Sequence, residues 1–193
     1  MKSICVYAGS AEGNKYEYTE KAQELGHAIA ENGYSMVYGG GSKGLMGVTA
    51  DSALSKGASV TGIITEQLDA IEVGHKGLTS LEIVSSMHQR KARMAELSDA
   101  IISLPGGVGT WEELFEALAW NQLGLYSKPI ILFNVEGYYS SLYKFSIEAV
   151  EEGFLPLTTF EELFISEDLN EIFHFISNFK KKDGKDWYKR LDR

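Results

Sequence analysis

The chain has 193 residues, of which 44% are hydrophobic and 23% are charged. This composition is typical of a globular protein and excludes a disordered chain, a collagen and a coiled coil, and a chain of this length can bury a core without disulfides or a metal ion. The net charge of −9 opposes binding to a phosphate backbone, so no nucleic-acid partner is expected.

Short apolar runs are predicted to be the strands of one sheet. They are Ser3 to Tyr7, Ser35 to Tyr38, Ala58 to Ile64, Leu81 to Val84, Ala100 to Leu104 and Ile130 to Asn134. Helical stretches separate these runs, and strands that alternate with helices form a parallel sheet. Because the runs are continuously apolar, helices should cover both faces. The sequence therefore predicts an α/β fold, a Rossmann-like doubly wound parallel sheet sandwiched by helices, with the single cysteine, Cys5, buried and inert.

The helices are predicted from caps and apolar stripes. Asn14 is a candidate N-cap of a helix that Asn32-Gly33 ends. Further helices are expected from about Tyr139 to Glu152 and from Asp168 to Phe179.

Two further helix starts match the capping box, in which a serine or threonine precedes a glutamate or glutamine by three positions. Ser86 with Gln89 is one match, and Thr110 with Glu113 is the other. We therefore expect one helix to begin at Ser86 and another at Thr110.

The rest of the chain indicates one domain. Basic residues concentrate only between Lys180 and Arg193, where aspartates are interleaved with them, as in a solvated tail. We expect one domain over residues 1–179 and a polar C-terminal tail over residues 180–193. No apolar run approaches the roughly 20 residues that span a bilayer, and the first run is too short for a signal peptide. A cytoplasmic protein with no membrane partner is therefore expected.

Glycine-rich turns follow three of the predicted strands. They are Ala8-Gly9-Ser10, Gly39-Gly40-Gly41-Ser42-Lys43-Gly44 and Pro105-Gly106-Gly107-Val108-Gly109-Thr110. In a parallel sheet these turns lie at the carboxyl edge, where glycines let backbone N–H groups approach an anion at a helix N-terminus. Any one turn could need glycine for tight geometry alone, but the three together indicate a phosphorylated ligand. None is a P-loop, so ATP-driven chemistry is not supported.

Arg90 lies on the predicted helix from Met87 to Leu97, in a row whose other members are Met87, Met94 and Leu97. That row faces the core. A buried arginine keeps its charge and must meet an anion, either a protein carboxylate or a ligand group. We favour a functional role over an internal ion pair.

Two adjacent carboxylates begin the helix predicted at Thr110. Glu113 is placed to complete the capping box, so we interpret it as structural first. Glu112 has no such local role, and an ionised carboxylate beside a phosphate site suits a reaction in which positive charge develops on a sugar.

The chain resembles the LONELY GUY (LOG) family, whose members are often mislabelled as lysine decarboxylases. The resemblance covers nearly the whole chain. The residues that carry it are Ser86-Met87-His88-Gln89-Arg90-Lys91-Ala92-Arg93-Met94 and Leu104-Pro105-Gly106-Gly107-Val108-Gly109-Thr110-Trp111-Glu112-Glu113, with Tyr38-Gly39-Gly40-Gly41 and Asn134-Val135-Glu136-Gly137-Tyr138-Tyr139 in support. The resemblance implies a phosphoribohydrolase, in which water cleaves the N-glycosidic bond of AMP or a cytokinin riboside monophosphate to give the free base and ribose 5-phosphate.

By this resemblance Arg90 and Glu112 are the catalytic pair, and the protein is a homodimer that needs no cofactor and no metal. The resemblance also implies that Lys91 and Glu113 belong to the nucleotide site. Together with the glycine turns, the expected substrate-binding residues are Gly9, Ser10, Gly40, Gly41, Lys91, Gly106, Gly107, Val108, Gly109, Thr110 and Glu113.

Two alternatives stay open at this point. A pyridoxal phosphate decarboxylase would need a Schiff-base lysine, and Lys43 and Lys91 are the lysines beside the predicted site. A carrier or sensor of a phosphorylated nucleotide or cofactor could use the same glycine turns without cleaving its ligand.

Overall fold

The computed structural model describes residues 2–72 and 74–180, so the predicted polar tail lies outside the described residues except for Lys180. A seven-stranded parallel sheet forms the centre, in the order β4-β3-β2-β1-β5-β6-β7. Its strands are β1 (Ser3–Tyr7), β2 (Ser35–Tyr38), β3 (Val60–Thr65), β4 (Ser80–Val84), β5 (Ala100–Ser103), β6 (Ile130–Phe133) and β7 (Leu163–Ser166). The predicted Rossmann-like α/β fold and its six predicted strands are confirmed.

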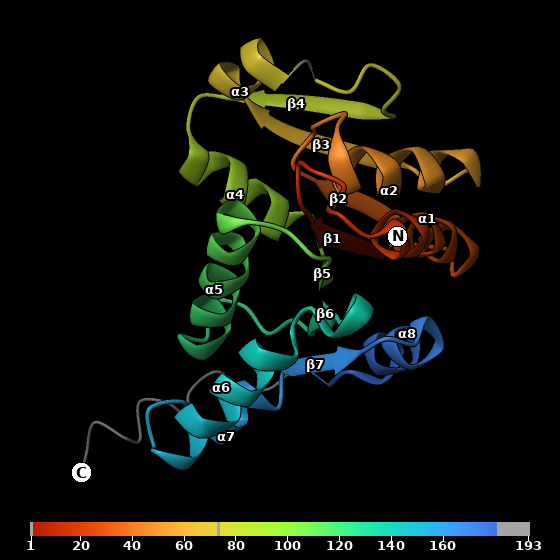
Figure 1. Cartoon of the computed structure of the whole chain (residues 1–193). Helices are drawn as coiled ribbons and strands as arrows, with labels where there is room; N and C mark the ends of the chain where they lie inside the picture. The colour runs from red at the N-terminus through yellow and green to blue at the C-terminus, as the bar shows by residue number, and fades with distance from the viewer. Residues whose placement is uncertain (1, 73, 181–193) are drawn as a thin grey trace.

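Helices cover both faces of the sheet (Figure 1). They are α1 (Tyr16–Glu31), α2 (Gly44–Ser55), α3 (Glu66–Glu72), α4 (Met87–Glu96), α5 (Val108–Gln122), the short 3-10 helix η1 (Val135–Gly137), α6 (Ser140–Glu151), α7 (Leu157–Phe160) and α8 (Leu169–Asn178). Helices α1, α2 and α8 pack on one face, and α4, α5 and α6 pack on the other. None of the helices in the described part of the chain combines the length and hydrophobicity that crossing a membrane requires.

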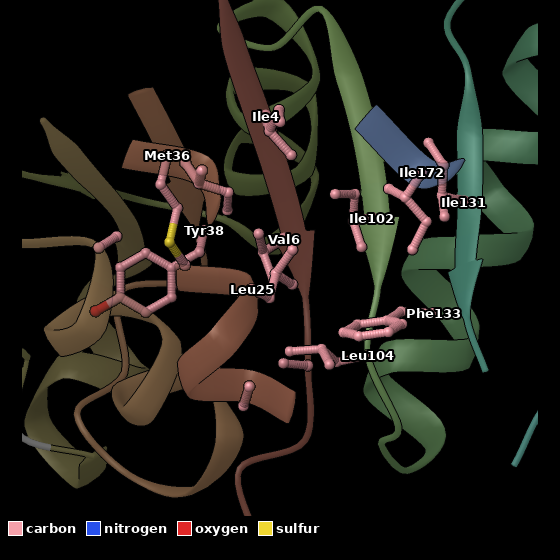
Figure 2. Close-up of a cluster of buried hydrophobic side chains, with 14 of the residues drawn as sticks. Ile4, Val6, Leu25, Met36, Tyr38, Ile102, Leu104, Ile131, Phe133 and Ile172 are labelled. Carbon is pink, nitrogen blue, oxygen red and sulfur yellow. The ribbon is translucent and has the colours of Figure 1, made fainter. Parts of the chain in front are cut away.

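Buried side chains of the strands join each helical layer to the sheet. Figure 2 shows one of the two clusters, to which Val6 of β1, Ile102 of β5, Phe133 of β6 and Leu25 of α1 belong; Leu25 lies beside Val6. Alternate residues of the same strands point to the other face, where Ile101 packs with residues of α4 and α5. The central strands β1, β5 and β6 are buried at every position and mostly apolar, as predicted for strands that helices cover on both faces. The edge strand β4 is partly exposed and contains Glu82.

The predicted helix boundaries are confirmed in part. The Ser86 side chain accepts a hydrogen bond from the Gln89 N–H (3.2 Å), so the predicted N-cap of α4 is confirmed. The predicted N-cap at Asn14 is wrong, because α1 is capped one residue later at Lys15, without a side-chain hydrogen bond. Sequence analysis also missed β7, a strand of only four residues.

The strand order reverses beside β1, which makes a switch point at the carboxyl edge of the sheet. The chain proceeds outward from β1 through β2 and β3 to β4, then returns to β5 on the other side of β1. The loops that follow β1 and β5 therefore diverge to opposite faces of the sheet. In open parallel sheets, ligands bind at such a switch point.

Candidate active site

The turns after β1 and β5 meet at the switch point. The Gly9 N–H donates a hydrogen bond to the Pro105 carbonyl (3.0 Å). A Cβ on Gly106 would lie 2.1 Å from Thr110 Oγ1 and 2.9 Å from the Gly9 nitrogen, so only glycine fits there. The first and third predicted turns are therefore packed backbone to backbone.

The turn after β2 adjoins the same place. A Cβ on Gly44 would lie 2.3 Å from the Ser10 carbonyl carbon, so the second turn packs on the first. Ser10 and Lys43 line a small cavity of about 180 Å³ there, whereas Gly40 and Gly41 are buried. The structure thus brings all three predicted glycine turns together.

Helix α5 begins at Val108, with Gly107 as its N-cap, and not at Thr110. The predicted capping box is wrong because the Trp111 N–H already bonds to the Gly107 carbonyl (3.0 Å), which places Glu113 in the second turn. The first N–H groups of a helix have no partner within it, so α5 presents such donors at the switch point. Gly107, Val108 and Gly109 are exposed at this end of the helix.

Arg90 forms a buried ion pair with Glu113. Arg90 Nη1 lies 3.0 Å from Glu113 Oε1, and these side chains are only 10% and 12% exposed. Arg90 Nε donates to the Ile63 carbonyl (3.0 Å), and Nη2 donates to the Gly39 carbonyl (3.4 Å). The guanidinium is therefore held by β3, by the turn after β2 and by α5 at once.

Arg90 pairs with Glu113 and not with Glu112, the residue that the sequence analysis couples with it. The Glu112 side chain is 51% exposed and pairs with Lys91. The correct partner could have been found from helical spacing, because Glu113 lies three residues after Thr110 and four before Ala117, both of which are buried. The assignment of Glu113 to a capping box concealed that row.

Burial raises the pKa of the Glu113 carboxyl above its ordinary value, although the adjacent Arg90 guanidinium lowers it. The carboxylate is thus a poorly hydrated negative charge whose main fixed partner is Arg90. Such a charge stabilises a developing cation more strongly than a hydrated one does.

Lys91 joins α4 to α5. Its buried ammonium pairs with Glu112 and lies 3.1 Å from Glu116 Oε1. Burial alone lowers the pKa of Lys91, but these two carboxylates outweigh burial and raise it. Its contacts within the protein support the α4–α5 arrangement that places Arg90 opposite Glu113.

Sequence analysis did not single out Tyr138 as a site residue, although it lies in a motif that carries the family resemblance. The Tyr138 hydroxyl donates a hydrogen bond to the Gly106 carbonyl, which ties the segment after β6 to the turn after β5. Within the residues that the structure describes, no group of three or more histidine, cysteine, aspartate or glutamate residues could hold a metal ion.

Comparison with known proteins gives a family and close relatives. Residues 46–176 match the family model described as "Possible lysine decarboxylase". The chain is 46% identical over 169 residues to the cytokinin riboside 5'-monophosphate phosphoribohydrolase of Rhodococcoides fascians, a match that covers 87% of this chain and 85% of that protein. It is 48% identical over 158 residues to the cytokinin riboside 5'-monophosphate phosphoribohydrolase LOG1 of Arabidopsis thaliana, which covers 82% of this chain and 74% of that protein.

Solved structures share the fold. The molybdenum cofactor carrier protein of Chlamydomonas reinhardtii superposes with a TM-score of 0.69 at 20% identity, covering 92% of this chain and 97% of that one. The molybdenum cofactor binding protein of Rippkaea orientalis gives 0.66 at 21% identity, covering 92% of this chain and 96% of that one. At these identities the likeness establishes the fold alone.

Proposed function

This chain belongs to the family of the possible lysine decarboxylase model, the LOG family, and on that premise we propose that it is a phosphoribohydrolase of nucleoside 5'-monophosphates. Water cleaves the N-glycosidic bond, and the products are the free base and ribose 5-phosphate. Cytokinin riboside monophosphates and AMP are the proposed substrates. The observation that carries the proposal is the buried Arg90–Glu113 ion pair at the switch point of the sheet.

In this proposal the N-terminus of α5 and the glycine turns bind the 5'-phosphate. The exposed first turn of α5 offers N–H donors and the positive end of the helix dipole. Thr110 is buried at this end of α5 and packs against Gly106 of the turn after β5. The other proposed contacts are Gly9, Ser10, Gly40, Gly41, Gly106, Gly107, Val108 and Gly109.

Glu113 is the proposed catalytic carboxylate, in place of Glu112. Cleavage of an N-glycosidic bond develops positive charge on the ribose ring as the base departs. An ionised Glu113 stabilises that charge, and Arg90 keeps the carboxylate ionised and fixed in direction. Arg90 itself does not donate a proton to the base, because its pKa exceeds about 12.

The environment of Lys91 disfavours decarboxylation through a Schiff base. A lysine that forms a Schiff base must present a neutral amine. The carboxylates of Glu112 and Glu116 instead raise the pKa of Lys91 and hold its ammonium form. The raised pKa therefore argues against Lys91 as a Schiff-base lysine.

A homodimer is part of the proposal. Phe115 of α5, Phe145 of α6 and Phe154 are exposed and line one apolar cavity of about 270 Å³. Trp111, one helical turn before Phe115, is 43% exposed. Exposed apolar patches of this kind mark protein interfaces. The cytoplasmic location and the lack of nucleic-acid or membrane partners stay predictions.

The direct test is chromatographic detection of free base. AMP and N6-isopentenyl-AMP are each incubated with the protein, and we expect adenine or N6-isopentenyladenine to appear with an equal amount of ribose 5-phosphate. The ratio of the two rates ranks the substrates. Tight binding of both nucleotides without base release would contradict the hydrolase and favour a nucleotide carrier.

The rate of base release should fall at acid pH as Glu113 becomes protonated. Because burial raises the pKa of this carboxyl, the acid limb of kcat should lie above the pH at which a solvent-exposed glutamate titrates. Activity is then present above the Glu113 pKa and is lost as the pH falls through it. A pH–rate profile measures the limb, and a limb at the pH of an ordinary carboxyl would argue against Glu113.

A further inference from the structure

The loop between α3 and β4 is fastened to the turn that supports Arg90. Gly74 forms an antiparallel bridge with Gly41, and the His75 N–H donates a hydrogen bond to the Gly40 carbonyl (3.1 Å). Gly40 directly follows Gly39, whose carbonyl accepts from Arg90 Nη2. The position of the 74–77 loop therefore bears on the position of the guanidinium.

The side chain of His75 anchors this loop through both ring nitrogens. It is only 9% exposed. Nδ1 accepts a hydrogen bond from the Gly77 N–H (3.1 Å), so this nitrogen carries no proton. The proton is then on Nε2, which lies 2.9 Å from Asp51 Oδ1 on α2. Because both ring nitrogens are hydrogen-bonded within the protein, the imidazole anchors the loop and is not free to transfer protons.

The turn after β2 is held from a second side. The Tyr38 hydroxyl donates to the Gly41 carbonyl (3.1 Å), and Gly40 has a φ of +77°, a left-handed conformation that suits glycine. The Gly74 N–H donates to Asp69 Oδ1 (2.9 Å) on α3. Residues 39–41 are thus held by Tyr38 on one side and by the 74–77 loop on the other. His75 attaches this loop to α2 through Asp51.

We propose that His75 is a positioning residue for the reaction. Through Asp51 and Gly77 it holds the 74–77 loop on Gly40, and this contact fixes the Gly39 carbonyl that orients Arg90 toward Glu113. The catalytic consequence rests on the proposed hydrolase, whereas the loop attachment does not. Because misplacing a reacting group by about 1 Å costs on the order of 10²-fold in rate, a small shift of the turn suffices.

His75→Ala tests the proposal with a kinetic and a structural measurement. We expect kcat for AMP to fall by about 10- to 100-fold. The affinity for ribose 5-phosphate should fall less than kcat does, since the proposed phosphate contacts on α5 and in the turn after β1 are untouched and only Gly40 and Gly41 lie in the loosened turn. Amide hydrogen exchange at residues 39–41 should accelerate, because the loop that covers them has lost its anchor. His174→Ala, an exposed histidine on α8, serves as the control and should change neither measurement.

Conservative variants separate positioning from general loss of structure. The oxygen of His75→Asn can replace Nδ1 as the acceptor for Gly77, and the amide nitrogen of His75→Gln can replace Nε2 as the donor to Asp51. Each should recover part of the lost kcat. Asp51→Ala should reproduce part of the defect and add little to His75→Ala, because His75→Ala already removes the hydrogen bond between His75 and Asp51.

Two results would overturn the proposal. One is a His75→Ala protein with wild-type kcat and unchanged exchange at residues 39–41. The other is a fall in activity that matches the loss of folded protein, with no change in kcat per folded molecule. If the wild-type protein releases no base, the hydrolase is wrong, and the exchange measurement alone still decides whether His75 holds the turn.

Discussion

Glu113→Gln should lower the rate of base release from AMP by on the order of 10²- to 10³-fold, the usual cost of removing one preorganised charge that stabilises a transition state. The amide keeps the size of the carboxylate and can still accept from Arg90 Nη1, so the fold should survive. What is lost is the negative charge beside the ribose. Single-turnover rates measured with saturating AMP report this loss directly.

Glu112→Gln is the matched control, since it makes the same chemical change one residue earlier. Glu112 is half exposed and pairs with Lys91, which retains Glu116 as a partner. The Glu112 end of this ion pair faces solvent and Glu116 still neutralises the buried Lys91 ammonium, so we expect a loss of less than about tenfold. If Glu112→Gln were the variant that abolished turnover while Glu113→Gln stayed active, the assignment made from the Arg90 contact would be reversed.

The sheet could be predicted from the sequence because its strands are buried on both faces. Runs such as Ile4 to Tyr7 are apolar at every position, and this signal needs no knowledge of the tertiary structure. The strand β7 lies at the edge of the sheet, where Phe164 and Ile165 are only partly buried. A four-residue edge strand has too weak a pattern to distinguish it from a loop.

The partner of Arg90 could not be identified with the same certainty. The apolar row on α4 showed that Arg90 is buried and needs an anion, and the structure confirms both. Which of two adjacent glutamates supplies the anion depends on where α5 begins. Gly107 is the N-cap, and this shift of three residues from the predicted start at Thr110 places Glu113 toward Arg90 and Glu112 toward Lys91. The predicted helix start at Thr110 therefore assigned Glu113 to a cap, whereas the structure makes it the partner of Arg90.

The contact between Arg90 and Gly39 was not visible in the sequence either, because it joins residues 51 positions apart. The sequence predicts the glycine-rich turn after β2 to be part of a phosphate site. In the structure Gly39 has a different role, since its missing side chain leaves room for the guanidinium. A glycine can therefore belong to a catalytic site by accommodating a protein side chain.

Gly39→Ala should reduce base release by on the order of 10²-fold, because it displaces Arg90. The new Cβ would lie 1.9 Å from Arg90 Nη2 and 3.1 Å from Cζ, so the guanidinium must move. Moving the guanidinium lengthens its hydrogen bond to the Ile63 carbonyl and its ion pair with Glu113. The buried charges of Arg90 and Glu113 are then less well paired. Turnover of AMP and the free energy of unfolding in urea measure the two consequences.

A double-mutant cycle with Arg90→Lys shows whether the clash is the cause. Lysine lacks the Nη2 atom that the new Cβ would strike, so in the Arg90→Lys background Gly39→Ala should cost almost no stability. In the wild-type background the same substitution should cost about 1–3 kcal/mol, the usual range for overpacking a buried site. The difference between these two values is the coupling between residues 39 and 90. Equal costs in both backgrounds would show that Gly39 is needed for the turn itself, and that the position of Arg90 is set without it.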